Sequence, residues 1–208
     1  MNPVLTIAQR AALGAGRILL RHFDHLERLN VTVKQRNDFV SEADVQAERE
    51  IIQTLRKTYP NHGILAEESG EQPGQDDYQW VIDPLDGTTN FLHGVPHFAI
   101  SIAFRHKTRL EAALVYDPMR QEMFTASRGQ SAQLNDRRIR VSGVNSLENA
   151  LLGTGFPFRH PQHRPAYLGM FGALLDKCTE IRRAGGAALD LAYVASGRLD
   201  AFWEIGLK

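Results

Sequence analysis

The sequence predicts an α+β fold, in which two helices precede a run of short strands instead of alternating with them. Apolar residues recur at helical spacing over residues 3–23, so this segment predicts an amphipathic helix with one buried face. The residues on that face are Leu5, Ala8, Ala12, Ala15 and Leu19. From residue 63 onward the apolar pattern changes to a period of two, which is typical of strands. Helices followed by a run of strands favour layers over βαβ winding.

A second helix is expected to begin at a capping box. Ser41-Glu42-Ala43-Asp44 places an acidic residue three positions after a serine, and such a pair satisfies the first N–H groups of a helix. The apolar residues that follow at helical spacing are Ile51, Ile52, Leu55 and Tyr59. Pro60 and Gly63 end this helix, and the polar stretch at residues 34–38 before it predicts a loop.

The remaining elements follow from the same patterns. Strands are expected over residues 63–66, 79–82, 97–104, 110–116, 122–125 and 139–141. A second βα segment follows, with a strand at 151–155 and helices at 167–175 and 187–196. We place a boundary near residue 142, between an N-terminal α+β domain over residues 1–142 and the start of a C-terminal α/β domain over residues 143–208.

The composition is typical of a globular protein that carries no net charge. The 208 residues are 43% hydrophobic and carry 24 basic and 24 acidic side chains, which is enough apolar content to fill a core. Uncharged apolar stretches reach about eight residues, far short of the roughly 20 that a membrane span needs. The N-terminus lacks the features of a signal peptide, and the single cysteine, Cys178, cannot form an internal disulfide. We expect a cytoplasmic protein without membrane association or strong direct binding to nucleic acid.

Two carboxylates stand at the end of an apolar strand. Asp83 ends the strand and Asp86 follows a turn in which Pro84 fixes one backbone angle, so their oxygens should share a small volume. Oxygen ligands favour a hard cation such as Mg²⁺. Gly87-Thr88-Thr89 can then present backbone N–H groups to a phosphate. The pattern points to metal-assisted phosphoryl chemistry.

A plain polar turn is the alternative interpretation of residues 83–87, because Asp, Pro and Gly dominate turns. A second acidic pair, Glu67-Glu68, directly follows another predicted strand. On its own this pair would be a solvated loop, but together with Asp83 and Asp86 it favours the metal interpretation.

Two segments carry a family resemblance. Ala66-Glu67-Glu68-Ser69-Gly70 and residues 80–91 (WVIDPLDGTTNF) resemble the inositol monophosphatase family, and the second segment matches its first signature nearly residue for residue. Further matching segments are residues 37–44, 96–99, 116–118, 153–157 and 182–185. Within the family the sequence is most similar to bacterial SuhB-type inositol-1-monophosphatases. The resemblance implies a layered αβαβα sandwich with the site between its two halves.

The resemblance also implies a set of site residues. Two or three Mg²⁺ ions would be held by Glu67, Asp83, Asp86 and the carbonyl oxygen of Leu85. The residues that act on the attacking water would be Thr88, Asp44 and Glu68, with the first two hydrogen-bonded to each other. The substrate would be bound by Asp86, Gly87, Thr88, Gly185, Ala187 and Glu204.

The activity implied by the resemblance is hydrolysis of inositol 1-phosphate, or of a similar small sugar phosphate, by metal-activated water. Sensitivity to lithium and assembly as a homodimer are implied as well. One alternative is another phosphate substrate, such as histidinol phosphate, a bisphosphate or NADP, because a few pocket contacts decide such preferences. The other is a SuhB-like partner of RNA polymerase in ribosomal RNA transcription, with incidental phosphatase activity.

The sequence departs from the family pattern at its end. The second family signature, Trp-Asp-x-Ala-Ala-Gly, would begin where the sequence reads Phe202-Trp203-Glu204-Ile205-Gly206-Leu207-Lys208. We therefore expect the C-terminal domain to be incomplete in this chain and the second metal site to lack its third carboxylate. A protein that ended there would bind Mg²⁺ less well and expose apolar surface, so it is expected to be inactive and poorly soluble.

Overall fold

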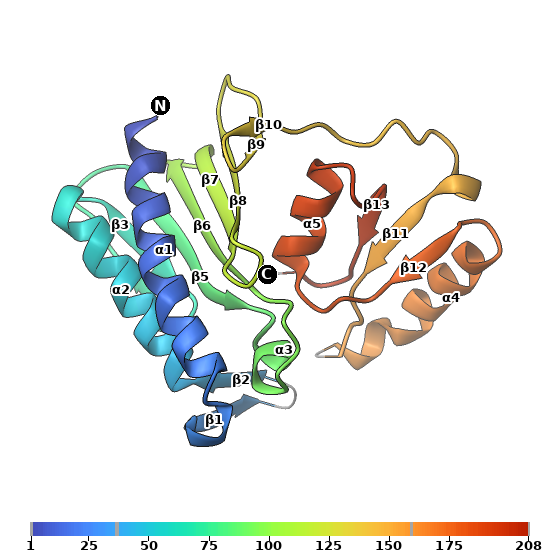
Figure 1. The fold of residues 1–208 in the computed structure, drawn as a ribbon, viewed down its shortest axis with the longest axis horizontal. Coiled ribbons are helices and arrows are strands. Elements are labelled where there is room, and N and C mark those ends of the chain that lie inside the picture. The colour runs from blue at the N-terminus through green and yellow to red at the C-terminus, as the bar shows by residue number, and fades with distance from the viewer. Residues whose placement is uncertain (1, 36–37, 159, 208) are drawn as a thin grey trace.

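Helices and sheets alternate in five layers, in the order helix, sheet, helix, sheet, helix (Figure 1). The architecture is seen in a computed structural model, which describes residues 2–35, 38–158 and 160–207, with the side chains of all of these except 33–35 and 38–40. The layer order confirms the expected αβαβα sandwich. In the described part of the chain, no helix is long and apolar enough to cross a membrane.

The first layer consists of α1 (Pro3–Phe23) and α2 (Glu42–Thr58). Helix α1 begins at Asn2, whose side chain accepts the N–H of Val4, as N-cap residues do. Its buried face is Leu5, Ala8, Ala11, Ala12, Gly14, Ala15, Gly16 and Leu19, which includes all five predicted residues. The capping box predicted for α2 is present at Ser41 and Asp44, and the helix ends before Pro60 as expected.

The loop predicted over residues 34–38 is wrong where the structure describes it. Residues 34 and 35 belong to β1 (Val31–Gln35) and residue 38 begins β2 (Asp38–Ser41), while residues 36 and 37 lie outside the described residues. The two strands pair antiparallel, with Val31 opposite Ser41. The polar character of this stretch gave no strand signal, because pairing between the backbones of β1 and β2 decides its conformation.

The second layer is an eight-stranded sheet with the order β10-β9-β8-β7-β6-β5-β3-β4. Its strands are β3 (Gly63–Ala66), β4 (Gly70–Gln72), β5 (Tyr78–Asp86), β6 (Ala99–His106), β7 (Arg109–Asp117), β8 (Glu122–Ser127), β9 (Gln133–Leu134) and β10 (Arg137–Arg138). Strands β3 and β5 are parallel neighbours, whereas β5 to β8 pair antiparallel in sequence.

The strand predicted over residues 139–141 is wrong, because the pairing falls at residues 137–138 instead. Asn135 and Asp136 have φ angles of 47° and 63°, the left-handed conformation that a tight two-residue hairpin turn requires. This turn pairs Arg137 with Leu134. The hairpin therefore takes its register from the turn and not from the apolar residues beyond it.

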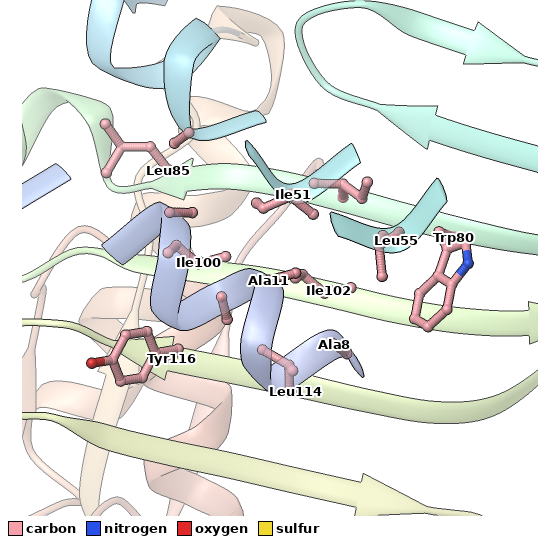
Figure 2. Close-up of a cluster of buried hydrophobic side chains, with 14 of the residues drawn as sticks. Ala8, Ala11, Ile51, Leu55, Trp80, Leu85, Ile100, Ile102, Leu114 and Tyr116 are labelled. Atoms are coloured by element: carbon pink, nitrogen blue, oxygen red, sulfur yellow. The ribbon is translucent and has the colours of Figure 1, made fainter. Parts of the chain in front are cut away.

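The main core lies between the two helices of the first layer and the eight-stranded sheet. Figure 2 shows its buried side chains, contributed by α1, α2, β5, β6 and β7. Trp80, Ile102 and Leu114 are each at most 2% exposed. Gly16 lets α1 approach the sheet, since a Cβ at this position would lie 2.7 Å from the Tyr116 ring.

The other three layers stand on the opposite face of this sheet. Helix α5 (Ala187–Ala195) packs Leu189 and Ala192 against Ala99 and Phe124. Beyond it lie three parallel strands in the order β12 (Glu180–Arg182), β11 (Leu151–Thr154) and β13 (Ala201–Trp203). Helix α4 (Arg164–Leu175) covers their outer face through the buried Tyr167 (Figure 1).

Short elements complete the chain. The 3₁₀ turns are η1 (Leu26–Arg28), η2 (Leu147–Asn149) and η3 (Pro161–His163), and the one-turn helix α3 (Thr88–Leu92) follows β5. The chain from residue 139 to 146 runs between the two halves without helix or strand (Figure 1). The domain boundary predicted near residue 142 falls in this segment, and the division into residues 1–142 and 143–208 stays a prediction.

Candidate active site

A β-bulge at the end of β5 turns two aspartates to the same side. Asp83 pairs with Ser101 and Asp86 with Ala99, so β5 carries one more residue than β6 over this step. The extra residue brings Ile82 and Leu85 together into the helix-facing core, which leaves Asp83 and Asp86 on the opposite side. The Leu85 N–H donates to Asp83 Oδ1 at 3.0 Å and fixes the turn.

The glutamate pair lies beside these aspartates because β3 is the parallel neighbour of β5. Ala66 pairs with Ile82, and the N–H of Glu67 donates to the Ile82 carbonyl oxygen at 3.1 Å. Carboxyl ends of parallel strands meet at one edge of a sheet, and the Glu67 side chain hydrogen-bonds Asp83 there. The structure thus brings together the three carboxylates that the sequence predicts as metal ligands.

A buried glutamate that sequence reasoning missed supports this loop. Glu48 of α2 is 4% exposed, and its two carboxylate oxygens accept the N–H groups of Glu68 at 2.8 Å and Ser69 at 3.0 Å. The available signal was a charged residue in the apolar stripe of α2, between Ala47 and Ile51. Such a residue is buried only with partners.

The start of α5 closes the site from the other half of the molecule. The Ala188 N–H donates to Asp86 Oδ2 at 2.8 Å. A Cβ on Gly186 would lie 3.3 Å from the same oxygen, so glycine lets the chain pass close to the carboxylate. Gly87, which precedes α3, has a φ of 91°, and a Cβ there would lie 3.0 Å from the His97 carbonyl oxygen.

Burial and mutual repulsion raise the pKa values of the carboxyl groups. Burial, followed by the charges of Asp86 and Glu67, raises the pKa of Asp83 well above its ordinary value. The pKa of Asp86 is raised to about 6, mainly by burial and further by the charges of Glu67 and Glu204. Burial also raises the pKa of Asp44. Concentrated negative charge of this kind favours protons or a cation.

The donor set fits a hard cation. Glu67, Asp83 and Asp86 supply only oxygen, and the Leu85 carbonyl oxygen lies at the same turn, which suits Mg²⁺ better than a soft metal. In the part of the chain that the structure describes, no three His, Cys, Asp or Glu side chains are already spaced as a metal cage.

The substrate side of the predicted site lies at the carboxyl edge of the three-stranded sheet and at the start of α5. Glu204 follows β13, and its charge acts on Asp86. The Asn90 side chain donates to the carbonyl oxygens of Ala184 at 2.9 Å and His97 at 2.8 Å. The bond to Ala184 ties α3 to the segment before α5 that carries Gly185, and the backbone of Ala187, the first residue of α5, hydrogen-bonds Asp86.

Asp190 is a second residue that sequence reasoning missed. It is 2% exposed, and its Oδ1 has no hydrogen-bond partner among the described residues. Burial, followed by the charges of Asp86 and Glu204, raises its pKa to about 7. Its only sequence signal was an aspartate inside the apolar helix Ala187–Ala195.

Comparison with known proteins identifies the family. Residues 1–208 match the Inositol monophosphatase family over the whole chain. The chain belongs to the inositol monophosphatase family. This membership makes it a Mg²⁺-dependent phosphatase, in agreement with the all-oxygen donor set of the site.

Curated relatives of the chain carry the name Nus factor SuhB. The chain is 58% identical to the Nus factor SuhB of Pseudomonas aeruginosa over 213 residues, and 54% identical to that of Escherichia coli K12 over 209. Both alignments cover 100% of this chain and 79% and 78% of the relatives, respectively. These matches confirm the expected similarity to SuhB-type members.

Solved structures of the family agree with this fold. The extragenic suppressor protein SuhB from Bartonella henselae superposes with a TM-score of 0.96 at 45% identity, over 99% of this chain and 79% of that one. An inositol monophosphatase from Anabaena superposes with a TM-score of 0.84 at 38% identity, over 98% of this chain and 75% of that one.

The catalytic pair implied by the family resemblance uses other partners in this structure. The Thr88 hydroxyl donates to the Leu85 carbonyl oxygen at 3.0 Å. The Asp44 carboxylate accepts the Ser41 N–H at 2.9 Å and the Ser41 hydroxyl. Asp44 still lies close enough to Glu67 for the negative charge of Glu67 to contribute to the raised pKa of Asp44. The roles of Thr88, Asp44 and Glu68 stay predictions.

Proposed function

We propose that this phosphatase hydrolyses inositol 1-phosphate or a similar small sugar phosphate at the cluster of Glu67, Asp83 and Asp86. The observation that carries the proposal is the proximity of two acidic groups at the start of α5. The first is the cluster of three carboxylates, and the second is Glu204, which lies close enough for its charge to act on Asp86. A phosphate needs the cation that the first group attracts, and sugar hydroxyls need acceptors such as the second.

Glu67, Asp83, Asp86 and the Leu85 carbonyl oxygen would hold two or three Mg²⁺ ions. When bound, the ions would neutralise phosphate charge and activate water for in-line attack. The short spacing of Asp83 and Asp86 along β5 supports this assignment, because both side chains leave the same bulge.

Asp44, Thr88 and Glu68 would act on the attacking water. A general base works best when its pKa approaches the operating pH, and burial raises the pKa of Asp44 in that direction. In this proposal the Thr88 hydroxyl leaves the Leu85 carbonyl oxygen and links Asp44 to the water. Glu68 is held in place through its own N–H, which donates to Glu48.

The backbone N–H groups of Gly87 and Thr88 would bind the phosphate, together with Asp86 through the ions. Gly185 and Ala187 would line the sugar pocket with their main chain, and Glu204 would accept hydrogen bonds from ring hydroxyls. The close passage of the chain at Gly186 beside Asp86 supports a pocket that opens between α3 and α5.

The test is phosphate release from a panel of substrates during a Mg²⁺ titration. Inositol 1-phosphate, histidinol phosphate, fructose 1,6-bisphosphate and NADP would be compared on the wild type and on Asp86→Asn. Asp77→Asn is the matched control, because Asp77 is exposed and forms a surface ion pair with Lys107 at 3.3 Å. A preference for a substrate other than a sugar monophosphate would overturn the proposed specificity.

A second function is favoured by the name Nus factor SuhB, which relatives 58% and 54% identical carry. We propose that the protein also contacts RNA polymerase in the cytoplasm, as the sequence comparison led us to expect. Pull-down of RNA polymerase by the wild type and by Asp86→Asn separates the roles, since the binding role requires no metal ligand. Equal failure of both proteins would contradict it.

We also propose a homodimer. Apolar side chains on α4 and the preceding loop are exposed, with Phe158 at 47%, Leu168 at 64% and Leu175 at 54%. Such a patch is typical of a contact surface, and a second copy would cover it. Light scattering on the wild type and on Leu168→Glu measures the mass, and a monomeric wild type would contradict the dimer.

A further inference from the structure

The residues that directly follow the parallel strands β11 and β13 lie on the substrate side of the proposed site. Thr154 pairs with Trp203, so the next residues, Gly155 and Glu204, leave the sheet at the same edge. The Gly155 N–H donates to the Trp203 carbonyl oxygen at 3.2 Å, and the Thr154 hydroxyl donates to the same oxygen at 3.0 Å. The backbones of Gly155 and Glu204 are therefore fixed relative to each other.

The carboxylate of Glu204 occupies the space that a side chain at residue 155 would need. A Cβ on Gly155 would overlap Cδ and Oε2 of Glu204 and would lie 2.6 Å from Oε1. Gly153 of the same strand differs, because a Cβ there would lie 2.8 Å from Leu199 and 3.1 Å from Phe202. The missing side chain at Gly153 thus allows close core packing, whereas the missing side chain at Gly155 leaves room for a charged group, the Glu204 carboxylate.

The charges around Glu204 make its placement sensitive to this contact. Asp86 and Asp190 both interact with the Glu204 charge, and like charges repel. The carboxylate is the far end of a flexible side chain, so any added atom at residue 155 would displace it at little cost to the fold. Its position then depends on the absence of a side chain at residue 155.

We propose that Gly155 determines specificity for polyol phosphates, because its bare main chain lets the Glu204 carboxylate lie where it accepts hydrogen bonds from substrate hydroxyls. The inference rests on the proposed function, in which Glu204 binds those hydroxyls. Gly155 is a positioning residue, since it acts through Glu204 and not on the reacting phosphate. Hydrolysis of a phosphate ester without hydroxyl groups should not depend on Gly155.

The test compares inositol 1-phosphate with 4-nitrophenyl phosphate, which has no hydroxyl groups, on the wild type and on Gly155→Ala. For inositol 1-phosphate we expect KM to rise roughly 10- to 100-fold with little change in kcat, the loss expected for hydrogen bonds to a charged acceptor. For 4-nitrophenyl phosphate both constants should stay within about twofold of the wild type.

A matched control and a double mutant separate positioning from a structural role. Gly169→Ala makes the same change on α4, where an added Cβ would have nothing within 4 Å. It should change neither KM nor kcat for either substrate. Glu204→Ala should raise the KM for inositol 1-phosphate as Gly155→Ala does. The double variant should be no worse than either single one, because both changes remove the same interaction.

The outcomes distinguish this inference from the proposed function. A wild type that hydrolyses neither ester with Mg²⁺ overturns the proposed function, and the inference with it. An active wild type whose substrate preference is unchanged in Gly155→Ala overturns the inference alone. Equal loss of both substrates also overturns it, because that result indicates a damaged fold. Additive losses in the double variant overturn it as well, because they show that Gly155 acts independently of Glu204.

Discussion

Asp86 is a residue at which the two halves of the site meet. Its Oδ2 accepts the Ala188 N–H, and its pKa is raised to about 6 by burial first and by neighbouring charges next. Asp86→Asn should abolish Mg²⁺-dependent turnover, because it removes a charge from the cation site. The thermal midpoint without Mg²⁺ should not fall, since the neutral amide relieves repulsion by Glu67 and Glu204. Turnover close to the wild-type rate would exclude Asp86 as a metal ligand.

Thr88 and Asp44 provide a second test at the scale of residues. Thr88→Ala and Asp44→Asn should each lower kcat by roughly 10²-fold, the scale for losing a proton-transfer partner. The double variant should be little worse than either one, since in the proposed function the two residues act as a unit. Titration of the rate with Mg²⁺ is the control. A large loss of Mg²⁺ affinity in Thr88→Ala would instead assign the hydroxyl to holding the Leu85 carbonyl oxygen.

At the scale of elements, α2 holds the loop that carries two glutamates. Glu48→Gln leaves one acceptor for the N–H groups of Glu68 and Ser69, so one buried donor loses its partner, at about 1–3 kcal/mol. The thermal midpoint should fall, and the Mg²⁺ concentration for half-maximal rate should rise. Glu42→Gln, on the exposed side of the same helix, is the control. Unchanged Mg²⁺ dependence in Glu48→Gln would limit its role to stability.

The elements that could be predicted were those with local signals. Helices α1 and α2 and strand β3 followed from apolar period and capping residues, which act within a few residues. The pairing of β1 with β2 and the position of β10 did not, because partner strands decide the first and the turn at Asn135 and Asp136 decides the second. Three-residue strands such as β12 carry too few positions to show a period.

The same distinction holds within the site. Convergence of Glu67, Asp83 and Asp86 could be predicted, since each follows an apolar strand. Glu48, Asp190 and Gly155 could not, because their importance comes from neighbours distant in sequence. For Gly155 that neighbour is Glu204, which follows another strand, and a glycine after a strand is ordinarily explained by a turn.

At the scale of the whole molecule, His62 makes stability depend on pH. Burial lowers its pKa below the ordinary 6.5, and its Nδ1 accepts the Trp80 indole N–H at 3.1 Å. Between the lowered pKa and 6.5 the unfolded chain binds more protons at this site. Its contribution is therefore complete above pH 6.5 and is lost as the pH falls through the folded-state pKa.

Thermal unfolding between pH 5 and 8 tests this contribution. Asp83 and Asp86 have raised pKa values, so they act in the opposite direction, and the comparison must be between variants. His62→Gln should lower the thermal midpoint at pH 7.5 and lower it less at pH 5. A constant difference across this range would show that His62 contributes packing alone.

The hydrogen bond from Ala188 to Asp86 has a thermodynamic consequence. Helix α5 lies between the two sheets, whereas Asp86 belongs to the eight-stranded one. In the proposed function, a sugar that shifts α5 as it binds would therefore also shift a carboxylate that would hold the cation. Linkage is reciprocal, so a cation that fixes Asp86 tightens sugar binding by the same factor by which the sugar tightens cation binding. In the proposed function, each half of the site therefore binds its ligand most tightly when the other half is filled.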